Sequence, residues 1–150
     1  MARFSRRFTI LMADDDREDC LLVEDALKEA HFDCDLRCVR DGEELCEYLY
    51  RRGAYAGVAD VPRPDLILLD LKMPRKNGRE VIAELKADKR FLQIPIVALT
   101  TSMAEDDIVG SYAMGVNSYI AKPATFRELV EAMRTIKRYW VDLVKLPPVT

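Results

Sequence analysis

The chain has 150 residues, 49% hydrophobic and 33% charged, the composition of a globular protein with a single core. Lys and Arg number 23 against 26 Asp and Glu, and the net charge of −3 argues against a nucleic-acid binder with a strongly basic surface. No apolar run approaches the roughly 20 residues of a membrane-spanning helix, and the acids at Asp14 to Asp16 exclude a signal peptide. We expect a cytoplasmic protein that contacts neither membrane nor nucleic acid.

The four cysteines lie in the first third of the chain and form no C-x-x-C pair. Together with His31, the single histidine, they make a poor zinc-binding set. We therefore expect reduced thiols that behave mostly as small, half-buried apolar side chains. His31 is predicted near a helix end and is given no function.

The first half of the chain predicts two strands and two helices. Phe8–Ala13 is a continuous apolar run that ends in acids, which is typical of a buried parallel strand. Asp15 or Asp16 caps the next segment, where apolar residues recur at helical spacing up to Ala30. Residues 33–39 alternate in polarity and predict a half-exposed edge strand. A helix over residues 43–50 and a Gly- and Pro-containing loop over 53–64 follow.

The second half continues the alternation. Buried strands are predicted at 66–69 and 94–99 and a last short strand at 118–121, with helices around Val81 to Leu85 and Ile108 to Ala113 between them. Five strands that alternate with helices indicate an α/β protein with a doubly wound parallel sheet and helices on both faces.

The final segment is longer than a closing helix requires. Apolar residues recur every three or four positions, which predicts a helix over residues 125–146 with a length of roughly 33 Å. Its last two turns would overhang the sheet and expose four large apolar side chains, Tyr139, Trp140, Leu143 and Leu146. Either this tail folds back on its own domain, or a partner or second copy of the chain covers it.

Polar residues follow the predicted strands at the points where they end. Asp14 to Asp16 follow the first strand, Asp70 the third, Thr100 the fourth and Lys122 the fifth. The carboxyl ends of parallel strands share one edge, where such sheets bind ligands. Clustered carboxylates repel one another unless a cation lies among them, and an all-oxygen ligand set suits Mg²⁺ better than zinc. Carboxylate, metal, hydroxyl and ammonium together suit a phosphoryl group that a carboxylate attacks in line.

The segments ILMADDD, LILLDLKMPRKNG, IVALTTS and SYIAKP, in this order and spacing, resemble the receiver domain of bacterial two-component response regulators. The resemblance covers residues 8–138. It implies a flavodoxin-like sheet of strand order 2-1-3-4-5 with five flanking helices, and phosphorylation of an aspartate by a sensor histidine kinase.

The resemblance also implies a role for each matched residue. Asp70 corresponds to the phosphoacceptor. With Asp14 as the leading acid, Asp15 and Asp16 form the Mg²⁺-binding pair, although the run of three aspartates leaves the register open by one residue. Lys72 would supply a backbone carbonyl to the metal.

Three further residues correspond to the family's switch. Thr100 matches the hydroxyl that follows the phosphoryl group, and Lys122 matches the ammonium that pairs with it. The Lys122–Pro123 bond is expected to be cis. Tyr119 occupies the position of the aromatic residue that turns inward as Thr100 moves.

A narrower resemblance rests on the segments RRGAYAGVADVPRPD and YWVDLVKLPP. They look like single-domain regulators that pair with cyanobacterial and bacterial phytochromes. This implies a red-light-sensing histidine kinase as partner and a homodimer through Tyr139, Trp140, Leu143 and Leu146. We expect one receiver domain over 1–150, with a core of 8–138 and an extension of 139–150.

Two other functions fit the same fold. An aspartyl-phosphate phosphatase needs a second acid two residues after its nucleophile, where this chain has Lys72. A docking module that works without phosphorylation would be free to lose one of the site residues, and none is lost. We therefore expect a signalling protein that catalyses only its own phosphotransfer and dephosphorylation, and that signals through a changed partner surface.

Overall fold

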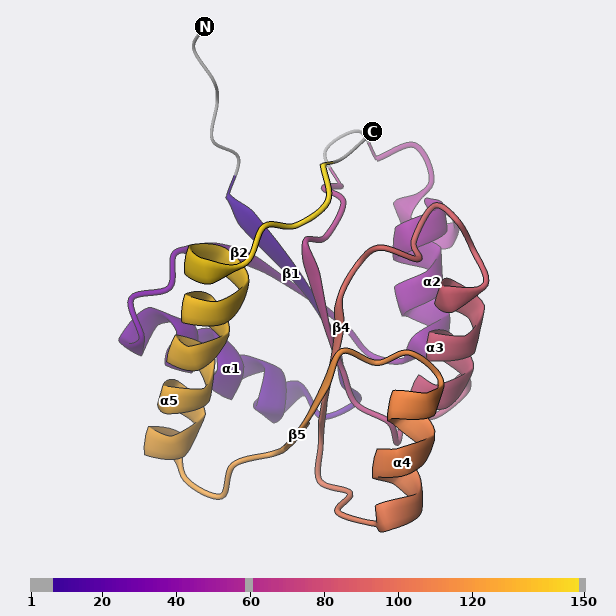
Figure 1. Ribbon diagram of the computed structural model, residues 1–150. Coiled ribbons are helices and arrows are strands. Elements are labelled where there is room, and N and C mark those ends of the chain that lie inside the picture. The colour runs from indigo at the N-terminus through magenta and orange to yellow at the C-terminus, as the bar shows by residue number, and fades with distance from the viewer. Residues whose placement is uncertain (1–6, 59–60, 149–150) are drawn as a thin grey trace, which may run out of the picture.

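The computed structural model describes residues 7–58 and 61–148 (Figure 1). Its five parallel strands form one sheet in the order β2-β1-β3-β4-β5, which confirms the predicted fold class and strand order. The strands are β1 (Phe8–Ala13), β2 (Cys34–Val39), β3 (Leu66–Leu69), β4 (Ile96–Thr100) and β5 (Ser118–Ala121). Two strands depart from their expected positions: β4 begins two residues later than predicted and ends one residue later, and β2 begins one residue later.

Helices cover both faces of the sheet (Figure 1). One face carries α1 and α5, and the other carries α2, α3 and α4. The helical segments are α1 (Arg17–Glu29), α2 (Gly42–Tyr50), η1 (Gly53–Tyr55), α3 (Gly78–Lys86), α4 (Glu105–Ala113), α5 (Phe126–Ile136) and η2 (Lys137–Leu143).

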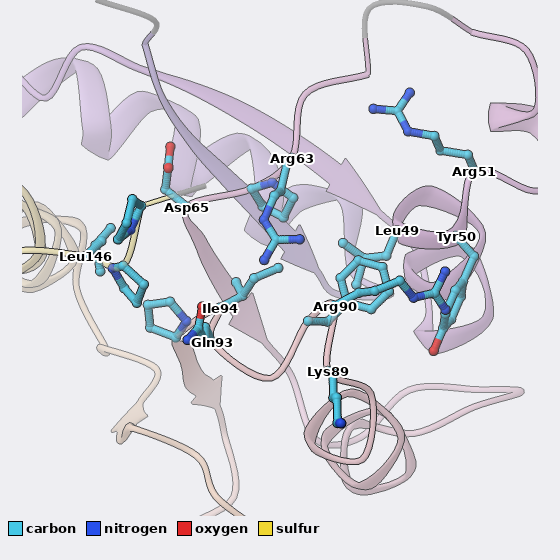
Figure 2. Close-up of a pocket in the computed structure, with 15 residues that line it drawn as sticks. Leu49, Tyr50, Arg51, Arg63, Asp65, Lys89, Arg90, Gln93, Ile94 and Leu146 are labelled. Carbon is cyan, nitrogen blue, oxygen red and sulfur yellow. The ribbon is translucent and has the colours of Figure 1, made fainter. Parts of the chain in front are cut away.

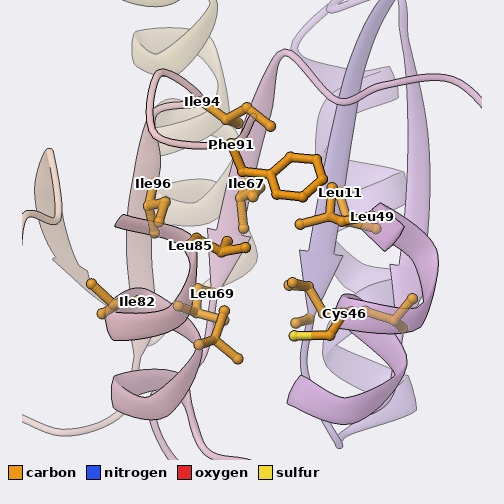
Figure 3. Close-up of a cluster of buried hydrophobic side chains, with 14 of the residues drawn as sticks. Leu11, Cys46, Leu49, Ile67, Leu69, Ile82, Leu85, Phe91, Ile94 and Ile96 are labelled. Carbon is orange, nitrogen blue, oxygen red and sulfur yellow. The ribbon is translucent and has the colours of Figure 1, made fainter. Parts of the chain in front are cut away.

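The three inner strands, β1, β3 and β4, are almost entirely apolar because both faces of the sheet are covered there, whereas β2 and β5 at the sides of the sheet are only half-buried. Every residue of β3 is fully buried, and its side chains alternate between two cores. Ile67 and Leu69 pack with residues of α2 and α3, such as Leu85 (Figure 3). Leu66 and Leu68 pack with residues of α1 and α5. This two-sided burial fixes the register of β3 and so determines where Asp70 emerges.

Side-chain caps start the helices close to the strand ends. Asp16, Asp41, Asn77 and Thr125 each accept a hydrogen bond from a backbone N–H in the first turn of the helix that follows. Asn77 and Glu80 complete a reciprocal capping box at α3. His31 lies just beyond α1, exposed and at a φ of 56°, which confirms its predicted place at a helix end.

The predicted helix over 125–146 is wrong in its extent. Regular α-helix ends at Ile136, a π-helical segment continues to Leu143, and the chain is extended from Val144. Trp140 packs against the core formed with α1 and α5, and Leu146 is half-buried, so neither is as exposed as predicted. Tyr139 and Leu143 do remain exposed.

The end of the tail folds back on its own domain. Leu146, Pro147 and Pro148 line a cleft of about 540 Å³ with residues that precede β3 and β4, as Figure 2 shows. This cleft lies at the amino ends of the strands, whereas Asp14 to Asp16 and Asp70 follow the carboxyl ends. In the described part of the chain, no helix is long and apolar enough to span a membrane.

The prediction of four reduced cysteines is wrong for two of them. Cys20 of α1 and Cys38 of β2 form a disulfide, with their Cα atoms 6.6 Å apart. The pairing depends on how α1 packs over the edge strand, which a separation of 18 residues does not reveal. Cys34 and Cys46 are free, and burial raises the pKa of each thiol to about 11.

Candidate functional site

Asp70 lies at the carboxyl end of β3, where its side chain is almost fully buried. Thr100, the last residue of β4, donates a hydrogen bond from Oγ1 to Asp70 Oδ1 over 2.8 Å. The backbone N–H of Lys72 donates to the same oxygen, and Lys122 Nζ lies 3.4 Å from Oδ2. The structure thus brings together the predicted carboxylate, hydroxyl and ammonium from three separate strand ends.

Three carboxylates in this pocket could hold a metal ion. Asp14, Asp15 and Asp70 each offer an oxygen, and these oxygens lie within 4.8 Å of one another. Asp14 is buried, and its Oδ2 lies 2.7 Å from Lys122 Nζ, within the distance of an ion pair. Burial raises the pKa of Asp14, outweighing the hydrogen bond from Lys122. A buried carboxylate beside two other acids, with all-oxygen ligand atoms, fits a hard divalent cation.

The metal-capable group differs from the predicted pair by one residue. Asp16 is exposed, and its Oδ1 accepts the backbone N–H of Glu18 as the N-cap of α1. Asp14 continues directly from β1, where its backbone N–H donates to Val39 of the neighbouring strand. The geometry therefore favours Asp14 and Asp15 over Asp15 and Asp16, because the helix cap uses the third aspartate.

Lys122 contacts an acid that follows β1 and an acid in the first turn of α1. Its Nζ lies 2.6 Å from an oxygen of Asp19, in α1, and 2.7 Å from Asp14. Burial alone would lower the pKa of Lys122, but the hydrogen bonds to Asp14 and Asp19 outweigh it, and the pKa is raised. The predicted cis bond at Lys122–Pro123 is wrong, since no described peptide bond is cis. The long side chain reaches the acids from a trans backbone, which is the lower-energy form.

Tyr119 lies close to the loop after β4. Its hydroxyl donates to the backbone oxygen of Ser102 over 2.8 Å, and its side chain is half-buried. Ser102 also donates a side-chain hydrogen bond to Asp107 of α4. Tyr119 is therefore hydrogen-bonded to Ser102, two residues after Thr100.

The sequence reasoning missed two residues of this site. Asp19 is the acid closest to Lys122, and its place in the first turn of α1 is the only signal that could have indicated it. Gly78 begins α3 against the backbone of Asp70, and a Cβ there would lie 2.5 Å from the Asp70 carbonyl oxygen. The G of LKMPRKNG thus has a steric role in addition to ending a loop.

Substitution of Gly78 by Ala should disturb the pocket. The added methyl group would meet backbone atoms of Asp70 and Leu71, which cannot rotate away. We expect the free energy of unfolding to fall by about 1–3 kcal/mol in urea titrations. In the matched variant Gly57→Ala, the added methyl group would have no atom within 4 Å. The positive φ of Gly57 should lower the free energy of unfolding by a smaller amount. Equal losses in the two variants would contradict the steric role of Gly78.

Known proteins resemble this chain over most of its length. It is 41% identical over 138 residues to the response regulator Rcp1 of Synechocystis, covering 92% of each chain. The solved structure of the phosphorylated cyanobacterial phytochrome response regulator RcpA has a TM-score of 0.86 at 40% identity, with 95% of this chain and 100% of that one covered. The response regulator RPA3017, in red light signalling of R. palustris, has a TM-score of 0.88 at 37% identity, covering 94% and 99%. The family model for the response regulator receiver domain matches residues 10–134, and the chain belongs to that family.

Proposed function

We propose that Asp70 accepts a phosphoryl group from a sensor histidine kinase. The observation that carries the proposal is the convergence of Thr100 Oγ1 and Lys122 Nζ on the two carboxylate oxygens of one buried aspartate. Asp70 attacks phosphorus through one oxygen, so that a P–O bond forms while the bond to the donor breaks. Lys122 and Thr100 then neutralise and hydrogen-bond the phosphoryl oxygens, where charge develops during transfer.

The pocket is proposed to hold Mg²⁺ between Asp14, Asp15 and Asp70, with the backbone carbonyl of Lys72 as a further ligand. Rcp1 has been solved in a Mn²⁺-bound form, and the donor set here is all oxygen. The bound ion would supply positive charge that offsets the phosphoryl oxygens. Lys122 would exchange its contact with Asp14 for one with the phosphoryl group.

Asparagine substitutions at Asp15 and Asp16 test the register of the metal-binding pair. Asp15→Asn removes a charged ligand and should weaken Mg²⁺ binding about tenfold or more. Asp16→Asn keeps a good N-cap for α1 and should leave Mg²⁺ affinity nearly unchanged. Isothermal titration of both variants measures the difference. The reverse order of effects would restore Asp15 and Asp16 as the pair.

Phosphorylation is proposed to change the surface formed by α4, β5 and α5. Thr100 would follow the phosphoryl group, and Tyr119, bonded to Ser102, would turn inward with it. The partner is proposed to be a phytochrome-type kinase, because RcpA is a phytochrome response regulator and RPA3017 acts in red light signalling. We further propose that the protein is cytoplasmic, that it forms a single domain with its core at 8–138, and that it binds no nucleic acid. It is proposed to catalyse only its own phosphotransfer and dephosphorylation.

The proposal is tested with acetyl phosphate, a small phosphodonor. The purified chain is incubated with it in the presence of Mg²⁺ or a chelator, and intact mass is measured. The gain of one phosphoryl group, dependent on Mg²⁺, is expected. Absence of any gain in a folded, Mg²⁺-binding protein would favour a docking module instead.

The outer face of η2 is proposed to form a homodimer. Tyr139 and Leu143 are 48% and 72% exposed, whereas Trp140 packs on its own core. Exposed apolar groups of this size on one segment are typical of an interface between chains.

Serine substitutions at Tyr139 and Leu143 should shift the protein from dimer to monomer in sedimentation. Trp140 is retained, because its removal would destabilise the monomer as well. Leu92→Ser, at a comparably exposed position after α3, serves as the control and should leave the mass dimeric. A dimer that survives the double substitution would place the interface elsewhere.

A further inference from the structure

Cys20 and Cys38 lie beside the acidic pocket and have no part in the function proposed so far. Both line a cleft of about 390 Å³ that also includes Asp14 and Asp15. Their Cα separation of 6.6 Å lies within the range that a disulfide spans without backbone movement. Cys38 is exposed and Cys20 is partly buried, and the cleft that both residues line is open to solvent.

We propose that Cys20 and Cys38 form a reversible thiol–disulfide site, with a low-molecular-weight disulfide as oxidant and a small thiol as reductant. In oxidation, the Cys38 thiolate attacks one sulfur of the small disulfide and releases its first thiolate. Cys20 then attacks Cys38 sulfur in the mixed disulfide and releases the second. Two electrons pass to the small disulfide, and the two cysteine protons end on the two released thiols.

The other two cysteines differ from this pair in their surroundings. Cys34 and Cys46 have no partner sulfur in the described structure, and Cys46 is fully buried. Burial raises the pKa of both thiols to about 11, so little of either is present as the reactive thiolate at neutral pH. The chain therefore contains its own internal controls for reactivity.

The disulfide would restrain the segment between β1 and α1, which carries Asp14 and Asp15. The backbone N–H of Asp14 already donates to Val39 over 3.1 Å, and the disulfide adds a second tie to β2 six residues later. The intervening residues include Asp15, which belongs to the metal-capable group, and Asp19, which contacts Lys122. Oxidation should restrict their motion and preorganise the pocket. This consequence rests on the proposed metal site, whereas the redox chemistry does not.

The experiment uses the full chain equilibrated in glutathione buffers of graded disulfide-to-thiol ratio. Intact mass with an alkylating agent reports free thiols, and peptide mapping identifies the linked pair. We expect loss of two hydrogens with Cys20 and Cys38 linked, reversed by thiol. The thermal midpoint of the oxidised form should be higher by about 5–10 °C. Its Mg²⁺ dissociation constant should be about threefold lower.

Two sets of variants separate the outcomes. A Cys34→Ser, Cys46→Ala variant should keep the reaction, whereas Cys20→Ser or Cys38→Ser should stop at a mixed disulfide or a free thiol. A link that never forms in these buffers, or one that maps to other cysteines, would overturn the redox site. A link that small thiols cannot reduce would make it a structural crosslink. An unchanged Mg²⁺ affinity in protein with a reversible link would overturn the coupling alone.

Discussion

Asp70→Asn should abolish phosphoryl uptake from acetyl phosphate. Asparagine has the same shape and can still accept the hydrogen bond from Thr100, but its amide is not a nucleophile toward phosphorus. Because the substitution also removes one of several clustered negative charges, the folded state should be no less stable. Intact mass spectrometry measures the uptake, and thermal unfolding checks the fold.

Asp25→Asn is the matched control for this substitution. Asp25 is an exposed residue of α1, and its replacement makes the same change in net charge. The control should take up phosphate as the wild type does. Persistent uptake by the Asp70 variant would require a different acceptor and would remove the basis of the proposed function.

Lys122→Met should destabilise the metal-free protein by about 3 kcal/mol. Lys122 is 14% exposed and neutralises Asp14, Asp19 and Asp70, which its loss would leave facing one another. Mg²⁺ should bind this variant more tightly than the wild type, because the divalent cation supplies the missing positive charge. Its addition should therefore recover part of the lost free energy of unfolding. Urea titrations with Mg²⁺ or with a chelator measure both effects.

Lys89→Met provides the comparison for this substitution. Lys89 is exposed at the other edge of the sheet, so its replacement should change the free energy of unfolding by less than about 0.5 kcal/mol. A loss in the Lys122 variant that is the same with and without Mg²⁺ would show that Lys122 stabilises the fold by packing rather than by neutralising the acids.

The sheet and most of the site could be predicted from sequence, because both depend on contiguous segments. A strand buried on both faces must be apolar throughout, so β1 and β3 are visible as uninterrupted runs. The polar residue that ends such a run must emerge at the carboxyl edge. Asp70, Thr100 and Lys122 were found in this way, and the structure brings all three together.

What the sequence left open depends on contacts between distant segments. Three successive aspartates satisfy the same pattern in two registers. The registers are separated by the Glu18 N–H, which donates to Asp16 as the helix cap, and by the position of Asp14 beside Asp15 and Asp70. The contact of Asp19 with Lys122 and the pairing of Cys20 with Cys38 require the packing of α1. In the tail, apolar spacing fits both α- and π-helical turns. Pro147 and Pro148 are the local signal that a helix must end before them.

The central claim is that the phosphoryl group resides on Asp70, and chemical mapping tests it most directly. The phosphorylated protein is treated with borohydride, which reduces an aspartyl phosphate to homoserine, and the peptides are then sequenced by mass spectrometry. Homoserine is expected at position 70, with unchanged aspartates at positions 14, 15 and 16. Homoserine at one of those three positions, with Asp70 intact, would contradict the claim.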